Sequence, residues 1–300
     1  MLHHVSPNPR APLTPIGHEP IHQLDNRHKG EVLNFLAERP IHTFIMSSWI
    51  NDNGLVSPFN RGTFYGCRDT QGGLEGVALI GHITLFETKS DAALTAFAKL
   101  TQSCASPHAV LGQGKKISRF KRDYTTNGGA PPRLVCRELL LEKQFTENLN
   151  TVQSLRPARS EELELVVPIH AQTAFEESGV NPLEVNPSGF RERCARRIKQ
   201  GRTWVAIEGG RLKFKIDVVS DTPEVVYLEG AYVSAEHRGN GYGAKCMTQL
   251  TNHLLERTKS VCLLVNQKNS AAQASYRKAG YQFREYYDTL YLQQPSVISN

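Results

Sequence analysis

Three glycines alternate through Gly239, Gly241 and Gly243, between a strand pattern and a helix pattern. Upstream, residues 225–233 place β-branched and aromatic residues in both alternating sets, which is typical of a strand covered on both faces. Downstream, residues at i, i+3, i+4, i+7 and i+8 would form one mainly apolar face of a helix: Met247, Leu250, Thr251, Leu254 and Leu255. The run therefore predicts a strand, a glycine turn and a helix.

Such a turn suits a bulky anion. Glycine permits positive φ and close approach, and the first turn of the helix offers unpaired N–H groups at the positive end of its dipole. A dinucleotide fingerprint needs G-x-G-x-x-G and a later acidic residue, but the spacing here is G-x-G-x-G and the next strand, 261–265, ends in Asn266. A P-loop needs Ser or Thr after its lysine, but Cys246 follows Lys245. Both nucleotide-binding motifs therefore fit the sequence poorly. A pyrophosphate-containing ligand of another kind remains as the candidate for this turn.

Arg238, Gly241 and Gly243 form the pattern Arg-x-x-Gly-x-Gly. This pattern resembles the one that GNAT acyl-CoA N-acyltransferases carry between their fourth strand and third helix. The resemblance continues through the Asn-x-x-Ala and Tyr-x-x-x-Gly-(Phe/Tyr) patterns, here Leu263 to Asn266, Asn269, Ala272 and Tyr276 to Tyr281. It covers about residues 155–292 and implies a GNAT fold, an α/β fold with a mixed sheet, for the C-terminal part.

The length of 300 residues predicts two domains. We expect a flexible leader at 1–24, an N-terminal domain at 25–150 and the GNAT domain at 151–300. The predicted order in the first domain is close to that in the second, so we expect a degenerate GNAT-like α/β domain there, by analogy. Its predicted elements are helices at 26–39, 41–50 and 91–100, strands at 62–67, 77–86, 109–111 and 133–142, and a glycine turn at 112–114 before a basic helix.

That second glycine turn, Gly112-Gln-Gly114, could be a vestigial cofactor turn, but it lacks the Arg-x-x-Gly-x-Gly spacing, so we expect no second cofactor. In the second domain we expect a short strand at 155–158, helices at 160–175 and 189–200, and a loop at 176–182. A hairpin across Gly209-Gly210 and paired final strands at 281–292 complete the prediction.

Composition excludes several classes of protein. The net charge of +6 and the isoelectric point near 9.0 fit an anionic cofactor, while the absence of a long Lys/Arg run does not favour nucleic acid. Six cysteines without C-x-x-C spacing argue against a zinc site or a disulfide framework and for a reducing compartment. No run reaches about 18 apolar residues and the N-terminus lacks a signal-peptide core, so we expect a cytoplasmic protein without membrane or metal.

The resemblance implies acetyl-CoA as the co-substrate. Backbone N–H groups of the turn would bind its pyrophosphate, and the preceding strand would pair with the pantetheine amides. The residues that match the family's cofactor positions are Arg238, Gly239, Asn240, Gly241, Tyr242, Gly243 and Ala244 in the turn, Ala231, Tyr232 and Val233 in the strand, and Asn269 and Tyr276 beyond it. Asn269 also has the position of a helix N-cap.

Two residues match the family's catalytic positions. Gly230 in mid-strand predicts a bulge or a close backbone approach, and the resemblance then directs the N–H of Val233 at the thioester oxygen. Tyr276 lies four residues before Gly280, where the family places the tyrosine that protonates the leaving thiolate. The alternative for Tyr276 is a side chain that only packs its helix on the sheet.

The base and the acceptor site are less specified. Glu229 is a carboxylate in an apolar strand, at i−4 from Val233 and so expected on the same strand face, which makes it a candidate base. A salt-bridged carboxylate at the rim is the alternative. Glu176 and Glu177 lie on the predicted loop that walls the acceptor site in this family, where they could bind a cationic acceptor or could simply be solvated.

The function that the resemblance implies is transfer of an acetyl or other acyl group from acetyl-CoA to a primary amine, by direct attack in a ternary complex. Two alternatives stay open at this point. One is a regulatory or interaction module that binds acyl-CoA without turnover, and the other is a transferase for an aminoacyl or nucleic-acid-linked substrate. The sequence does not separate a small amine from a peptide N-terminus or a lysine as acceptor, and it leaves the oligomeric state open.

Overall fold

The computed structural model describes residues 21–105, 107–147 and 152–293. Most of the predicted leader and of the link near residue 150 lies outside these ranges. Residues 21–23, which the sequence places in the leader, form strand β1 (Ile21–Gln23), which pairs antiparallel with β2 (Gly62–Arg68). The boundary between domains near residue 150 stays a prediction.

The N-terminal half has its strands and helices in the expected order after β1. The single strand expected at 77–86 is divided at Gly81 and His82, because the chain turns there against Arg61: a Cβ on Gly81 would lie 2.2 Å from the Arg61 carbonyl oxygen. The elements after β2 are β3 (Leu74–Gly81), β4 (Ile83–Thr88) and β5 (Ala109–Gln113), with α1 (Lys29–Ala37), α2 (Pro40–Asn53), α3 (Asp91–Gln102) and α4 (Gly114–Thr126).

The C-terminal half follows the predicted order closely. The hairpin turns through Gly209 and Gly210, with φ of 56° and 71°, and Gly201, with φ of 68°, follows the helix that it was expected to end. Its elements are β7 (Leu155–Pro157), α5 (Leu163–Ser178), α6 (Pro182–Val185), α7 (Pro187–Lys199), β8 (Thr203–Glu208), β9 (Arg211–Asp221), β10 (Val225–Val233), α8 (Tyr242–Leu255), β11 (Ser260–Asn266) and α9 (Ser270–Lys278).

The predicted loop around Glu176 and Glu177 is wrong. Both residues belong to the last turn of α5, which continues to Ser178 and is capped by Gly179 in the left-handed conformation, with φ of 69°. Glycine adopts this conformation at little cost, so the helix ends there and not at the preceding glutamates.

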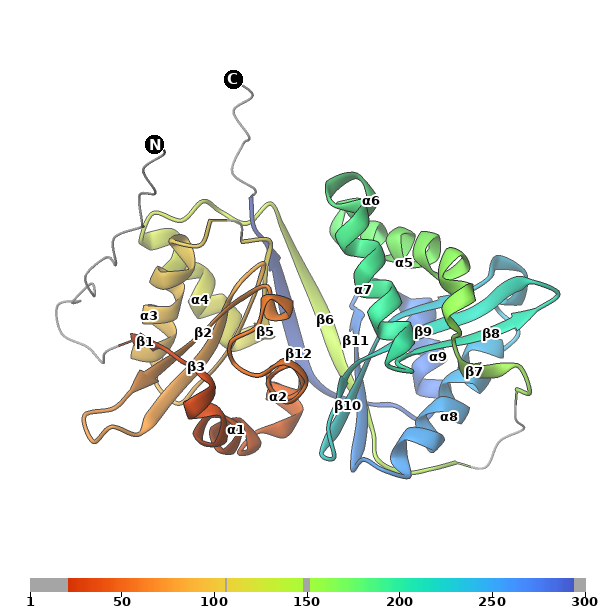
Figure 1. Ribbon diagram of the computed structural model, residues 1–300, viewed down its shortest axis with the longest axis horizontal. Helices are drawn as coiled ribbons and strands as arrows, with labels where there is room; N and C mark the ends of the chain where they lie inside the picture. The colour runs from red at the N-terminus through yellow and green to blue at the C-terminus, as the bar shows by residue number, and fades with distance from the viewer. Residues whose placement is uncertain (1–20, 106, 148–151, 294–300) are drawn as a thin grey trace, which may run out of the picture.

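The two halves exchange strands in one twelve-stranded sheet (Figure 1). Strand β6 (Leu134–Lys143), which precedes residue 150, pairs antiparallel with β11 of the C-terminal half. The end of the chain forms one strand, β12 (Gln282–Tyr291), which lies between β6 and β5 and pairs antiparallel with both. The pair of final strands expected at 281–292 is therefore wrong, because the partners of the single strand come from the other half.

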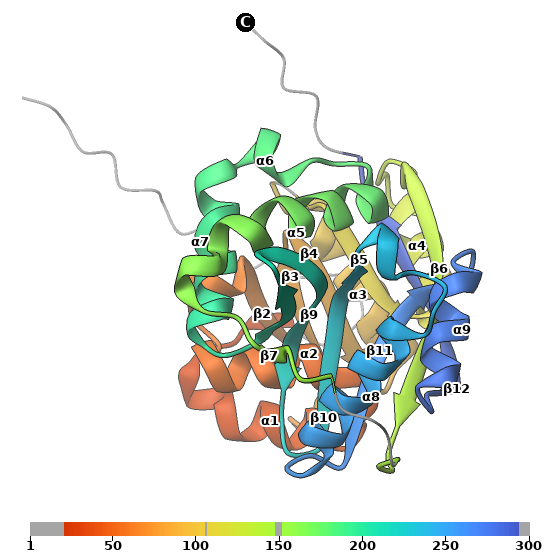
Figure 2. The same cartoon turned by 90° about the vertical axis from the view of Figure 1, so that its right-hand side faces the viewer.

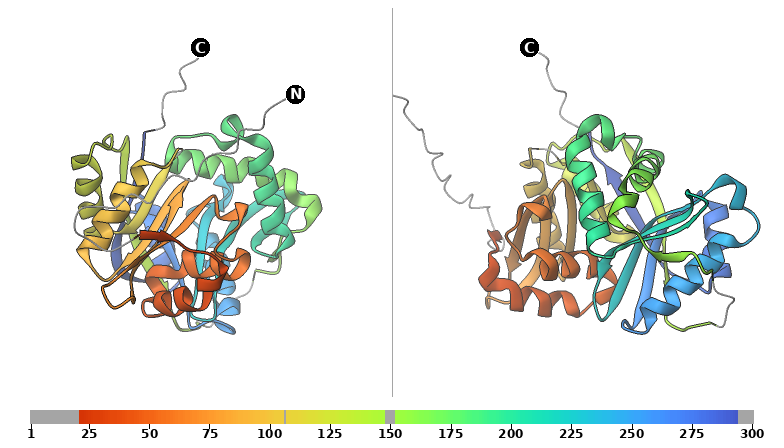
Figure 3. Two further views of the ribbon diagram at one scale, coloured as in Figure 1. Left: turned by 60° about the vertical axis from the view of Figure 1, so that its left-hand side comes forward. Right: turned by 45° about the vertical axis from the view of Figure 1, so that its right-hand side comes forward.

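Helices cover both faces of this sheet (Figures 2 and 3). In the C-terminal half, α8 and α9 lie on one face and α5 and α7 on the other (Figure 2). Each core contains side chains from the exchanged strand. Leu290 of β12 is buried with Phe97 and Phe120 of the N-terminal half, and Leu141 of β6 is buried with Met247 of the C-terminal half. Neither core is complete without the other half of the chain.

Because of this exchange, we predict that the two halves unfold together. The chain has one tryptophan in each half, Trp49 and Trp204, so Trp49→Phe and Trp204→Phe give single-tryptophan reporters. Both reporters should show the same denaturant midpoint. Leu290→Ala should lower the free energy of unfolding by about 2–5 kcal/mol at both reporters, since it empties part of a core. Two separate midpoints, or a shift at Trp49 alone, would contradict the prediction.

Candidate functional site

Strands β10 and β11 separate at one end. They pair in parallel from Val225 and Ser260 as far as Leu228 and Leu263, and β10 then continues to Val233 without pairing with β11. We call this open end the splay. The pairing of β10 with β9 shifts register just there, between Glu229 and Tyr232, and Gly230 has φ of 65°. The bulge predicted at Gly230 is confirmed.

The bulge changes which side chains share a face. Across β9, Glu229 lies opposite Asp217, Tyr232 opposite Lys215 and Val233 opposite Phe214. Because directly opposed residues point to one side of a sheet, Glu229 shares a face with Tyr232 and not with Val233. The expectation that Glu229 and Val233 lie on one face is wrong, since the extra residue inverts the alternation.

The backbone N–H of Val233 points into the splay. The N–H of Ser234 donates to the Lys213 oxygen of β9 at 2.9 Å. Successive residues of a strand direct their N–H groups to opposite edges, so the Val233 N–H is directed away from β9, toward the side where β11 has separated. An unpaired donor at this point can stabilise an oxyanion.

A buried ammonium holds the bulge. Lys215 on β9 is fully buried, and its Nζ donates to the Gly230 carbonyl oxygen at 3.3 Å and to Nδ1 of His170 at 2.8 Å. It also forms an ion pair with Asp217, which Arg197 of α7 contacts at 3.0 Å. Gly230 needs to lack a side chain, since its Cβ would lie 3.1 Å from Lys215 Nζ.

The protonation states of this network follow from burial and charge. Burial would raise the pKa of Asp217, but Lys215 and Arg197 outweigh it and hold that pKa well below its ordinary value. Burial, and next the charge of Lys215, lower the pKa of His170 to about 4. His170 is therefore a neutral acceptor for the Lys215 ammonium at neutral pH.

The glycine turn after β10 has the expected geometry. Gly239 and Gly241 have φ of 78° and 81°, and α8 begins directly afterwards. A Cβ on Gly243 would lie 2.9 Å from Cγ2 of Val233, so this glycine lets the helix approach the strand. Arg238 donates from Nε to the Val233 carbonyl oxygen at 2.9 Å, which fastens the turn to the end of β10.

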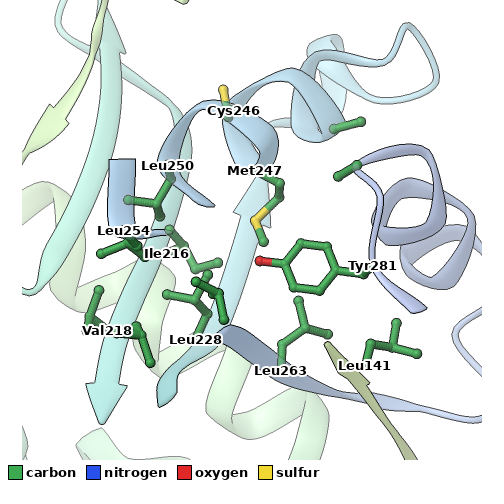
Figure 4. Close-up of a cluster of buried hydrophobic side chains, with 14 of the residues drawn as sticks. Leu141, Ile216, Val218, Leu228, Cys246, Met247, Leu250, Leu254, Leu263 and Tyr281 are labelled. Carbon is green, nitrogen blue, oxygen red and sulfur yellow. The ribbon is translucent and has the colours of Figure 1, made fainter. Parts of the chain in front are cut away.

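Helix α8 is held firmly over the sheet (Figure 4). Its side chains Met247, Leu250 and Leu254 pack on strand residues such as Leu228 and Leu263. Thr251 and the hydroxyl of Tyr281 share a hydrogen bond of 2.6 Å, so this buried phenol has a partner. The N-terminus of α8 is thereby fixed at the end of β10, and the Tyr242 N–H there donates to Asn240 Oδ1 at 3.1 Å.

Helix α9 and its N-cap place two polar side chains, Asn269 and Lys278, near the candidate site. The side chain of Asn269 accepts a hydrogen bond from the Ala272 N–H at 3.0 Å, which confirms the predicted N-cap. Lys278 Nζ lies 3.2 Å from the position that a Cβ on Gly241 would occupy. This cation beside the glycine turn was not predicted, although its sequence lies within the Tyr276 to Tyr281 motif.

Tyr276 packs beside the core and lies near the Glu177 carboxylate. It is half-buried and contacts the core under α8, with its ring centroid 6.1 Å from that of Tyr281. Burial, and next the charge of Glu177, raise the pKa of Tyr276 above its ordinary value. Its phenol is therefore protonated at neutral pH and can serve as a proton donor.

Three carboxylates, the acidic trio, gather from three elements: Glu138 of β6, Glu177 of α5 and Glu229 of β10. Burial raises the pKa of Glu138 to about 7, although a hydrogen bond of 2.6 Å from the Thr289 hydroxyl acts to lower it. Burial, and next Glu229 and Glu138, raise the pKa of Glu177 to about 8. Burial also raises the pKa of Glu229, although Arg197 opposes it.

Solvent reaches the Glu177 and Glu229 side chains, yet protein surrounds them closely enough to raise their pKa. The structure thus brings the Glu177 and Glu229 carboxylates near each other. It separates Glu176, whose Oε1 accepts from Gln172 Nε2 at 2.8 Å on the exposed side of α5. Glu138 was not predicted, because no local motif shows that β6 joins the C-terminal half.

The N-terminal half repeats the strand arrangement with different residues. Strands β4 and β5 pair in parallel only to Leu85 and Leu111, as β10 and β11 do. The counterpart of the glycine turn is then the segment before α3, and not Gly112–Gly114, which lies between β5 and α4. The possibility of a vestigial cofactor turn at Gly112–Gly114 is therefore not supported by its place in the fold. In place of an anion, the first turn of α3 carries Asp91, paired with Arg119.

The gap between β4 and β5 is closed by side chains. Glu87 is buried there and forms ion pairs with Lys116 of α4 and Arg39. What remains is a cavity of about 20 Å³, lined in part by Glu87, Gln113 and Tyr287. A cofactor arm could not enter without displacing this network.

Comparison with known proteins identifies the C-terminal half. Residues 171–281 match the family model described as the acetyltransferase (GNAT) family. The chain has no significant match among curated proteins. Among described residues, no helix is long and apolar enough to cross a membrane, and no cluster of three or more His, Cys, Asp or Glu could hold a metal.

Solved structures resemble the chain over both halves. A Drosophila protein superposes with a TM-score of 0.65 over 92% of this chain and 99% of its own, at 11% identity. A tandem GNAT protein from the clavulanic acid biosynthesis pathway superposes with a TM-score of 0.56 over 92% of this chain and 99% of its own, at 13% identity. A GNAT-family acetyltransferase from Colwellia psychrerythraea superposes with a TM-score of 0.55 over 91% of this chain and 99% of its own, at 15% identity. At these identities the likeness concerns the fold, and it confirms the predicted two-domain GNAT-like architecture.

The turn leads to a binding prediction. Gly241→Glu should weaken acetyl-CoA binding at least tenfold by calorimetry (about 1.4 kcal/mol), because it places a charged side chain where the anion would lie. Gly72→Glu is the matched control: Gly72 also has positive φ, of 86°, but it lies on the β2–β3 turn of the N-terminal half with open space around it. Unchanged binding by Gly241→Glu, or equal loss in both variants, would contradict the assignment.

Proposed function

We propose that this chain, whose residues 171–281 form a GNAT acetyltransferase domain, transfers an acetyl group from acetyl-CoA to a primary amine. One observation carries the proposal. The end of β10 places a directed backbone donor, a glycine turn at a helix N-terminus and the acidic trio around a single splay. Acyl transfer to an amine needs these three parts: an oxyanion donor, a site for the cofactor and a base.

Cofactor binding would use the turn and the strand. The N–H groups from Arg238 to Ala244 would bind the pyrophosphate, with Lys278 adding a positive charge. The backbone of Ala231 to Val233 would pair with the pantetheine amides, so that the thioester enters the splay. Asn269, the N-cap of α9, and Tyr276 within α9 would lie on the other side of the pantetheine arm.

The acceptor would approach from the face that carries the acidic trio. An alkylammonium group with pKa near about 10.4 must lose a proton before it can attack. Glu177 or Glu229, with raised pKa, would take that proton directly or through water. Glu176 would remain outside this step, because it bonds to Gln172.

The chemical step would be direct attack in a ternary complex. The amine nitrogen forms a bond to the thioester carbon, and the oxygen takes the negative charge and accepts the Val233 N–H. The carbon–oxygen double bond then re-forms as the carbon–sulfur bond breaks, and the thiolate of coenzyme A receives the proton of the Tyr276 phenol. The attacking nitrogen, which is positively charged after it bonds to carbon, loses a proton to water, and the Tyr276 phenolate regains a proton from water. The products are an N-acetylated amine and free coenzyme A thiol.

Release of free thiol from acetyl-CoA in the presence of a panel of amines and peptides tests this function. We predict amine-dependent thiol release, and in Tyr276→Phe an about 10²-fold lower turnover with nearly unchanged acetyl-CoA affinity. Tyr281→Phe is the control for loss of a buried phenol outside the site. Acetyl-CoA bound without thiol release would favour a binding module instead, and equal turnover in Tyr276→Phe would remove this residue from the mechanism.

The acidic trio predicts the pH dependence. A base must be deprotonated, so turnover should rise as pH increases through about 7 to about 8, the values for Glu138 and Glu177. Glu177→Gln should lower the rate and shift or remove the upper part of this rise. Glu176→Gln should keep the profile of the parent chain. Identical profiles for Glu177→Gln and the parent, measured as kcat/KM from pH 5.5 to about 9, would contradict the role of Glu177.

A further inference from the structure

A row of basic side chains crosses one edge of the N-terminal strands. The carbonyl oxygen of Arg61 accepts from the His82 N–H at 3.0 Å, and the His82 oxygen accepts from the His108 N–H at 2.9 Å. The imidazoles of His82 and His108 stack at 4.8 Å with planes 4° apart. The backbone thus places three basic residues from three segments next to one another.

The row continues toward the acceptor side. The His108 oxygen accepts from the Leu292 N–H at 2.8 Å, and the His108 ring meets the Tyr291 ring edge to face at 5.6 Å. The guanidinium of Arg133 lies over the Tyr291 ring, 5.3 Å from its centroid. Arg133 also donates to the Ser178 oxygen at 2.6 Å, one residue after Glu177. We call Arg61, His82, His108 and Arg133 the basic row.

Helix α7 of the C-terminal half lies beside the N-terminal half (Figure 3). Arg196 of α7 lies over the Phe59 ring of the N-terminal half at 4.3 Å, which fixes the helix against this edge. Arg193, one turn earlier, lies close enough to Arg61 and His82 to lower the pKa of both. The basic groups therefore converge from two sides of the boundary between the halves.

Arg61 and Arg193 carry the positive charge at this boundary. Burial, and next Arg193, lower the pKa of Arg61 to about 10, and burial, and next Arg61, lower the pKa of His82 to about 3. Within residues 21–105, 107–147 and 152–293, neither Arg61 nor Arg193 has an ion pair with a carboxylate, although the neighbouring Glu192 offsets part of the charge on Arg193.

The contrast with nearby arginines is informative. Arg197, on the same helix as Arg193, contacts Asp217, and Arg202 forms an ion pair with Asp52. Arg61 also has φ of 53°, the one positive value outside glycine in the described part of the chain. A strained backbone that holds an uncompensated guanidinium is typical of a functional position.

We propose that Arg61 and Arg193, with the rest of the basic row around them, form a subsite for a carboxylate or phosphate group of the acceptor. Two guanidinium groups offer paired donors that match both anions, and the neutral His82 imidazole can add an N–H donor. Because the row ends at Arg133, beside Glu177, one acceptor could place its amine at the acidic trio and its anionic group at the row. The link to an acceptor rests on the proposed function, whereas anion binding itself does not.

Calorimetry with inorganic phosphate and with acetate tests the subsite on the full chain. Saturable binding of at least one of them should be weakened at least tenfold by Arg193→Met and by Arg61→Asn, since asparagine tolerates the left-handed backbone of residue 61. Arg211→Met, an exposed arginine on the β8–β9 hairpin, is the control and should bind as the parent does. The preferred anion identifies the group that the acceptor carries.

The glycine turn could also bind phosphate, so Gly241→Glu separates the two sites. Binding that survives Gly241→Glu and is lost in Arg193→Met and Arg61→Asn supports the subsite. Binding that is lost in Gly241→Glu but kept in the arginine variants, or no saturable binding of either anion, overturns it. None of these outcomes depends on thiol release, so the subsite and the proposed acyl transfer can fail separately.

Discussion

The contact between the buried Lys215 ammonium and the Gly230 carbonyl determines the shape of the candidate site. An ammonium buried without partners would be strongly destabilising, at about 3–5 kcal/mol when a buried pair is broken, but Asp217 and neutral His170 satisfy this one. The bulge that Lys215 supports inverts the strand alternation, so that Glu229 lies on the sheet face of Asp217 and Lys215, and Val233 lies on the face of α8. The splay, its backbone donor and its carboxylate all depend on this local arrangement.

Strand exchange explains why the chain needs two halves when only one has the features of a cofactor site. The N-terminal half fills its own strand gap with Glu87 and Lys116 and places Asp91 at the start of α3. It supplies β6 instead, and with it Glu138, to the other half. Its edge also provides Arg61 opposite α7. Its contribution is thus to complete the core and to place these residues beside the C-terminal half.

Local signals in the sequence predicted local structure. The glycine turn, the bulge at Gly230, the Asn269 cap and the hairpin at Gly209-Gly210 each depend on a few adjacent residues, and all four are confirmed. Sequence could not predict which strands pair across the chain, since the residues of β6 alternate in the same way whichever neighbour they have. Glu138, Lys278 and the basic row were missed for that reason, because each acquires its partners only through distant contacts.

The central claim is that the splay receives the thioester of an acyl-CoA. A crystal structure of the full chain with acetyl-CoA tests it most directly. The account predicts the pyrophosphate on the turn at Gly239 to Gly243 and the thioester oxygen within about 3 Å of the Val233 nitrogen. Acetyl-CoA bound elsewhere, or a thioester oxygen directed away from Val233, would contradict the account.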